Sequence, residues 1–64
     1  MLESVHEFIE NKYNKKFEYV EPNIEEEEIL EQECSGEYEY GILKNGLYYV
    51  FEIIPELFYF FKEV

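Results

Sequence analysis

The Asn45-Gly46 pair is the sequence feature that most constrains the fold, because this dipeptide is the preferred centre of a tight β-hairpin turn. Residues 37–43 precede it and residues 47–54 follow it, and both segments are rich in aromatic and branched aliphatic side chains. Such side chains are typical of β-strands. The pair therefore predicts an antiparallel hairpin in the middle of the sheet.

The expected turn type also fixes the register of this hairpin. A two-residue type I′ turn places Lys44 opposite Leu47 and gives the two strands one mostly apolar face and one mixed face. The apolar face, which we expect to line the core, holds Tyr38, Tyr40, Ile42, Leu47, Tyr49, Phe51 and Ile53. The mixed face holds Glu37, Glu39, Gly41, Leu43, Tyr48, Val50, Glu52 and Ile54.

The N-terminal segment has the pattern of an amphipathic helix. Ser4 and Glu7 fit a capping box, and the apolar side chains that follow recur at helical spacing. We therefore expect a helix over residues 4–14. The segment Phe17–Glu21 predicts a short strand, which Pro22 would end.

Two further segments complete the expected fold. Pro55 suits the first position of a helix, and apolar residues then recur at helical spacing up to Val64, so we expect a short C-terminal helix. Residues 23–36 fit either a helix that ends at Gly36 or a strand over about 28–34, and both alternatives stay open. The whole chain, residues 1–64, is expected to form a single α+β domain with a small antiparallel sheet.

The charge of the chain is strongly one-sided. Its 64 residues include 16 glutamates and no aspartate or arginine, and the formal net charge is −11. Between Lys16 and Lys44 there are ten glutamates and no basic residue. Such a chain repels nucleic acid and anionic membranes, so we expect it to bind neither directly. It attracts cationic surfaces instead.

The sequence offers few residues for catalysis. It has one histidine, His6, and one cysteine, Cys34, and nothing in their spacing brings the two side chains together. We expect no enzymatic activity, no cofactor and no metal site, and we expect Cys34 to be a partly buried apolar residue. A lone cysteine without an export signal favours a cytoplasmic location.

The acidic stretch has three interpretations: a solvated face that keeps the protein soluble, a docking surface for a basic partner, or a mimic of a nucleic-acid backbone. For partner binding, the candidate carboxylates are those of Glu25, Glu26, Glu27, Glu28, Glu31, Glu33, Glu37 and Glu39. Tyr48 or Tyr59 is the candidate aromatic anchor beside them. Glutamates two residues apart on a strand project roughly 6–7 Å apart on one face.

In size, charge and aromatic content, the chain resembles small acidic DNA-mimic inhibitors encoded by phages and mobile elements. The resemblance is to a functional class of many folds and rests on no motif. It implies an anti-defence inhibitor that blocks the nucleic-acid site of a host defence or repair enzyme through protein–protein interaction. The alternative is a small structural or regulatory interaction domain, monomeric or homodimeric, whose charge serves only solubility.

Overall fold

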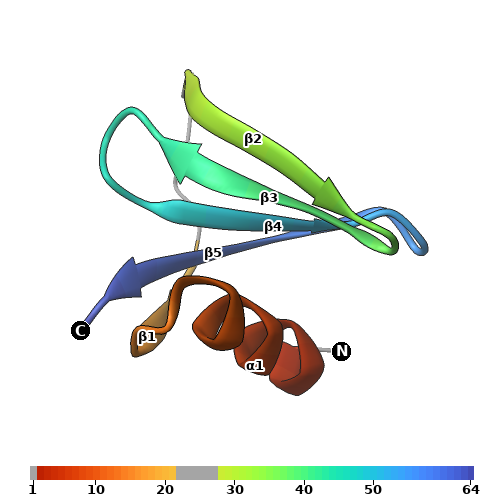
Figure 1. The fold of residues 1–64 in the computed structure, drawn as a ribbon, viewed down its shortest axis with the longest axis horizontal. Coiled ribbons are helices and arrows are strands. Elements are labelled where there is room, and N and C mark those ends of the chain that lie inside the picture. Colours follow the sequence, from red (N-terminus) through yellow and green to blue (C-terminus); the bar gives the residue numbers. More distant parts are fainter. Residues whose placement is uncertain (1, 22–27) are drawn as a thin grey trace.

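The computed structural model describes residues 2–21 and 28–64 and contains one helix and one antiparallel sheet of five strands (Figure 1). In chain order the elements are α1 (Leu2–Tyr13), β1 (Phe17–Val20), β2 (Ile29–Ser35), β3 (Tyr38–Leu43), β4 (Tyr48–Glu52) and β5 (Leu57–Glu63). The expected α+β class with an N-terminal helix is confirmed. No described helix is long and apolar enough to cross a membrane.

The strands lie in the spatial order β1-β5-β4-β3-β2, and every neighbouring pair is antiparallel. Strands β2 to β5 follow one another as a meander, and β1 adds to the free side of β5. The two strands that are consecutive in sequence, β1 and β2, therefore form the two opposite edges of the sheet. Helix α1 lies beside β1, whereas β2 is at the far side of the sheet (Figure 1).

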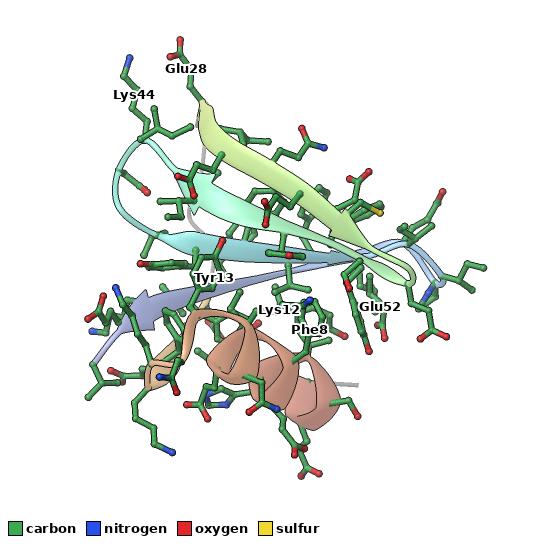
Figure 2. All side chains as sticks on the ribbon, in the orientation of Figure 1. Phe8, Lys12, Tyr13, Glu28, Lys44 and Glu52 are labelled. Carbon is green, nitrogen blue, oxygen red and sulfur yellow. The ribbon has the colours of Figure 1, made fainter. Side chains whose placement is uncertain are left out.

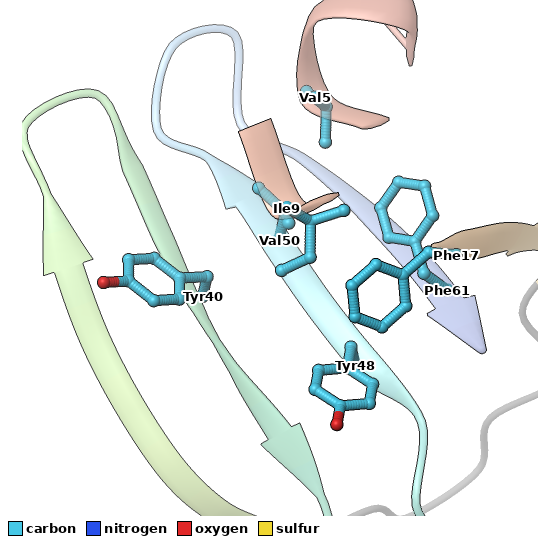
Figure 3. Packing of buried hydrophobic residues seen from close by; sticks show 7 residues of the cluster. All are labelled: Val5, Ile9, Phe17, Tyr40, Tyr48, Val50 and Phe61. Carbon is cyan, nitrogen blue, oxygen red and sulfur yellow. The ribbon is translucent and has the colours of Figure 1, made fainter. Parts of the chain in front are cut away.

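The core lies between α1 and one face of the sheet. Val5 and Ile9 of α1 are fully buried there, as are Val50 and Phe61 on the interior strands β4 and β5. Figure 3 shows how these side chains meet. The remaining members of the cluster are aromatic: Phe17, Tyr40 and Tyr48. Because aromatic side chains bury a large area each, they fill this core with few residues.

The helix begins earlier than the sequence pattern suggested. It includes Leu2, so Ser4 lies inside the helix and is not its N-cap, and the predicted capping box is wrong. The helix ends at Tyr13, and Asn14 follows with a positive φ of 54°. Asparagine tolerates this left-handed conformation better than most residues, which explains why it stands where the chain turns into β1.

The predicted short C-terminal helix is wrong, because Leu57–Glu63 forms strand β5. This strand is central and pairs with β1 on one side and β4 on the other. Its alternation places Tyr59 and Phe61 towards α1, while Phe58 and Phe60 lie on the opposite face. The apolar run is too short for its period to distinguish a helix from a strand, and its aromatic composition favours the strand.

The predicted hairpin exists, but its register differs by one residue. Ile42 pairs with Tyr48, and Leu43 N–H donates to the Leu47 carbonyl oxygen over 2.7 Å. Three residues, 44–46, therefore form the loop. Gly46 has the expected positive φ, 95°, whereas Asn45 does not have the positive φ that a type I′ turn requires. The geometry fits a type I turn followed by a left-handed glycine.

This shift reverses the faces of β4 and leaves those of β3 as predicted. Tyr48 and Val50 point towards α1 with Tyr40, while Tyr49 lies on the opposite face next to Gly41. The predicted core position of Tyr49 is thus on the wrong face, although the side chain is buried there. A one-residue change in loop length is sufficient for this, because side chains alternate along a strand.

The two alternatives for residues 23–36 are resolved for the described part. Residues 29–35 form strand β2, which turns back into β3 through Gly36 and Glu37. Gly36 has a φ of 63°, as the first central residue of a type II′ turn requires. A helix that continues to Gly36 is excluded. Residues 23–27, including Asn23, lie outside the described residues.

Candidate acidic interface

The candidate interface is built on the β2–β3 hairpin, at the edge of the sheet away from β1. We call its four carboxylates, those of Glu31, Glu33, Glu37 and Glu39, the acidic edge. Glu31 and Glu33 lie on the α1 side of β2, because they pair with Ile42 and Tyr40. Glu37 is in the turn, and Glu39 is on the opposite face of β3.

The acidic edge is largely exposed to solvent. Glu31, Glu33 and Glu37 are exposed, and Glu39 is half-buried. Of these four side chains, only Glu33 accepts a hydrogen bond within the described residues, from the Tyr40 hydroxyl over 3.0 Å. That contact fixes one carboxylate of the edge against a buried ring of the core.

The lysines that form ion pairs do not contact the acidic edge. Lys15 pairs with Glu63 over 3.1 Å and Lys62 pairs with Glu18 over 3.5 Å, both at the β1–β5 side of the sheet. Lys44, in the β3–β4 loop, contacts Glu28 over 3.1 Å (Figure 2). Across residues 2–21 and 28–64, no lysine forms an ion pair with the acidic edge. The four carboxylates of the acidic edge therefore have no lysine partner, whereas lysines pair with Glu18, Glu63 and, at the start of β2, Glu28.

The field of the acidic edge reaches tyrosines on both faces of the sheet. The pKa of Tyr13 is raised to about 12, first by burial and then by the charges of Glu31 and Glu33. The pKa of Tyr49, on the other face, is raised by burial and by Glu39. Negative charges disfavour the phenolate, so both shifts have the sign that an acidic surface produces.

Aromatic rings line the border between α1 and the acidic edge. Lys12 Nζ lies 5.7 Å from the ring centre of Phe8 and 5.6 Å from that of Tyr40 (Figure 2). At these distances the Lys12 ammonium makes cation–π contacts with both rings, and these contacts hold it against the ring faces. Tyr13 packs edge-on against Tyr48 with ring centres 4.8 Å apart.

The two predicted aromatic anchors differ in accessibility. Tyr48 is only 8% exposed and belongs to the core, so it cannot serve as a surface anchor. The register shift of the hairpin caused this error. Tyr59 is half-buried on the α1 side of β5, and its hydroxyl lies 3.4 Å from a carboxylate oxygen of Glu52. Neither tyrosine lies on the β2–β3 hairpin.

The predicted carboxylates are only partly brought together. Glu28 precedes β2 and lies beside Lys44, at the opposite end of the strand from the Gly36 turn. Glu25, Glu26 and Glu27 lie outside the described residues. The structure therefore places Glu31, Glu33, Glu37 and Glu39 on one hairpin and Glu28 next to a lysine.

The structure separates the two residues considered for nucleophilic catalysis. His6 lies on α1 at the β1 edge, where Nε2 donates to the Phe17 carbonyl oxygen over 2.7 Å. Cys34 is a free, exposed thiol on β2, at the other edge and on the other face, so its expected partial burial is wrong. The described residues contain no group of three or more His, Cys or carboxylate side chains that could hold a metal ion.

A second surface feature consists of exposed apolar side chains, and Phe58 among them was expected from the sequence to lie at the surface. Ile54 is 86% exposed and Phe58 is 56% exposed, next to the turn between β4 and β5. A surface cavity of about 360 Å³ there is lined by Gly36, Glu37, Ile53 and Ile54. The two turns meet because Ile53 N–H donates to the Glu37 carbonyl oxygen over 3.1 Å. The pairing of β3 with β4 brings these residues together, because Tyr38 lies opposite Glu52.

Comparisons with protein-family models, with curated protein sequences and with solved structures gave no match to this chain.

Proposed function

We propose that this protein is a non-enzymatic inhibitor or binding protein that docks its acidic edge on a basic, nucleic-acid-binding surface of a partner protein. One observation carries the proposal: Glu31, Glu33, Glu37 and Glu39 share one edge hairpin, while the ion-paired lysines lie elsewhere in the described structure. Such an arrangement concentrates the field of a highly charged protein on one side.

The spacing of the edge supports mimicry of a nucleic-acid backbone. Glu31 and Glu33 are two residues apart on one face of β2, which corresponds to roughly 6–7 Å along the strand. This is close to roughly 7 Å, the axial rise over two nucleotide steps of one DNA strand at roughly 3.4 Å per step. A surface that binds phosphates with lysine and arginine side chains would meet carboxylates at the spacing of every second phosphate.

The proposed partner is a host defence or repair enzyme in the cytoplasm, and the protein acts by occupying its nucleic-acid site. The protein requires no cofactor or catalytic group for this action. Affinity would come from charge complementarity, which speeds encounter and makes binding sensitive to salt. Exposed Cys34 is compatible with a reducing compartment.

The second candidate is an interaction domain that forms a homodimer through apolar contacts. The exposed side chains of Ile54 and Phe58 favour it, because exposed apolar surface of this kind often marks an interface. Such an interface would hold at high salt, whereas docking of the acidic edge would weaken. The two candidates therefore make opposite predictions about salt.

Competition with nucleic acid tests the proposal. The immobilised protein is exposed to a bacterial lysate, and bound proteins are eluted either with duplex DNA or RNA or with an uncharged polymer as control. The proposal expects nucleic-acid-binding proteins to be released by the nucleic acid and not by the polymer. If the bound proteins resist both nucleic acid and high salt, mimicry is wrong and the apolar interface is the better account.

A further inference from the structure

The two edges of the sheet differ in how their backbone groups are satisfied. At the β1 edge, Phe17 N–H donates to a carboxylate oxygen of Glu10 over 3.0 Å, and the Phe17 carbonyl oxygen accepts from His6 Nε2 over 2.7 Å. Side chains of α1 thus occupy both outward groups of Phe17. The bond from Phe17 also lowers the pKa of Glu10. The β1 edge is therefore closed to an added strand at this residue.

The β2 edge is open. Ile29 to Cys34 are exposed, and in the described part of the sheet β2 is the last strand, with β3 as its only neighbour. Seven residues make β2 longer than the four-residue β1. An open edge strand presents unpaired N–H and C=O groups that another extended chain can bind.

The register shows which groups point outwards. Ser35 and Tyr38 close a two-residue turn, so the backbone groups of Ser35 face β3, and by alternation those of Glu33 do too. Strand β3 gives the same result. Leu43 N–H bonds to the Leu47 carbonyl oxygen on the β4 side, so the backbone groups of the neighbouring residue Ile42 face β2. The N–H and C=O groups of Gln32 and Cys34 consequently point away from the sheet.

We propose that the outer edge of β2 binds an extended basic segment of the partner as an added β-strand, paired through the backbone groups of Gln32 and Cys34. This inference rests on the proposed function, since it names the part of the basic partner that meets the acidic edge. Side chains of the added strand would alternate, with lysine or arginine on the α1 side opposite Glu31 and Glu33. Cross-strand neighbours lie close enough for such opposite charges to stabilise the pair.

Charge selects this occupant over a second copy of the chain. Antiparallel pairing of two β2 strands with Gln32 opposite Cys34 places Glu33 directly opposite the same residue of the second copy. Like charges at directly opposite positions destabilise a strand pair. The same carboxylates favour a basic strand, so they discourage self-association while leaving the edge available.

The experiment uses two peptides of equal length and composition. In one, lysine alternates with valine, and in the other all lysines precede all valines. Amide hydrogen exchange of the full-length protein is measured with each peptide, together with peptide affinity. Gln32→Pro removes an outward N–H without changing charge, and proline is tolerated where an edge N–H faces solvent. Gln32→Thr is the matched control that keeps the N–H.

The inference expects the alternating peptide to slow exchange at Gln32 and Cys34 by about tenfold or more, and the block peptide to leave both unchanged. Gln32→Pro should weaken binding of the alternating peptide about tenfold, and Gln32→Thr by less than about twofold. The exchange measurement uses the unchanged protein, so it tests strand addition at β2 even if Gln32→Pro does not fold.

Three results would overturn the inference. If both peptides bind equally and exchange at Gln32 and Cys34 does not change, binding uses charge alone; strand addition is then wrong and the proposed function stands. If Glu31→Gln/Glu33→Gln binds the alternating peptide as tightly as the unchanged protein, the acidic edge itself is not the docking surface. If exchange slows with protein concentration in the absence of peptide, the occupant is a second copy.

Discussion

The Tyr40 hydroxyl donates a hydrogen bond of 3.0 Å to a carboxylate oxygen of Glu33, which links a buried ring of β3 to the exposed acidic side of β2. Through this bond one charge of the acidic edge is held by the core. A carboxylate in a fixed position loses less conformational freedom when it binds a partner.

Removal of this hydroxyl should destabilise the fold modestly. Tyr40→Phe should lower the free energy of unfolding by about 1 kcal/mol, because one hydrogen bond is lost while the ring remains. Tyr59→Phe is the matched control, and its loss should be smaller because that hydroxyl lies 3.4 Å from Glu52, beyond the usual hydrogen-bond range. Urea unfolding measures both. A larger loss for Tyr59→Phe would contradict this account of the acidic edge.

Gly41 is required by close backbone packing within the sheet. A Cβ atom at this position would collide with the Glu31 carbonyl oxygen and lie 2.9 Å from a ring carbon of Tyr49. Gly41→Ala should therefore destabilise the fold by about 2–3 kcal/mol, since the backbone of β2 would have to move. The loss is measured by thermal or urea unfolding.

The control for this prediction is Gly46→Ala. A Cβ at Gly46 meets nothing within 4 Å, so its cost should come only from the positive φ of 95° and be about 1 kcal/mol. Equal losses for the two variants would show that the approach of Glu31 to Gly41 has been placed wrongly.

The sequence predicted those parts of the fold that are determined by local chemistry. Gly46 required a turn and Phe17–Glu21 had strand composition, and the structure has a turn at Gly46 and strand β1 over Phe17–Val20. The register of the β3–β4 hairpin could not be predicted, because Asn45-Gly46 suits both a two-residue loop and a three-residue loop. This difference of one residue in loop length decides whether Tyr48 lies in the core or at the surface.

Long-range pairing was beyond the sequence. The period of residues 57–63 fits a helical stripe as well as a strand. Their aromatic composition favours the strand, and their place between β1 and β4 decides it. The acidic stretch predicted the charge of the candidate site but not its grouping. Strand β2 and its register place Glu31 and Glu33 on one face and Glu28 beside Lys44.

The strand assignment of β5 predicts which apolar side chains matter for stability. Phe61 is fully buried, whereas Val64 is 80% exposed, although a helical stripe would bury both. Phe61→Ala should cost about 3–5 kcal/mol. Val64→Ser should change the free energy of unfolding by no more than about 0.5 kcal/mol. Comparable losses at the two positions, measured by urea unfolding, would instead support a C-terminal helix.

Alkaline pH should destabilise the protein through Tyr13. Its folded-state pKa of about 12 lies above the ordinary value of 10.0, so the folded protein keeps a proton that the unfolded chain releases. The stabilisation is complete below pH 10 and is lost as the pH rises towards 12. Thermal unfolding across this range should show a falling melting temperature.

Two variants identify the group responsible. Tyr13→Phe should make the fall in melting temperature shallower, because the phenol with the raised pKa is gone. Tyr19→Phe, at the exposed β1 edge, is the matched removal of a phenol away from Glu31 and Glu33. If both variants behave like the unchanged protein, the pKa of Tyr13 is not raised in the folded state.

The salt dependence of partner binding, compared between two variants of equal net charge, tests the central claim most directly. Glu31→Gln/Glu33→Gln neutralises two charges of the acidic edge, and Glu3→Gln/Glu7→Gln neutralises two exposed charges on α1. Affinity for a partner captured in the competition experiment is measured across a range of salt concentrations. The account predicts weaker binding and a shallower salt dependence for the first variant only. Equal behaviour of the two variants, or affinity that does not change with salt, would contradict docking through the acidic edge.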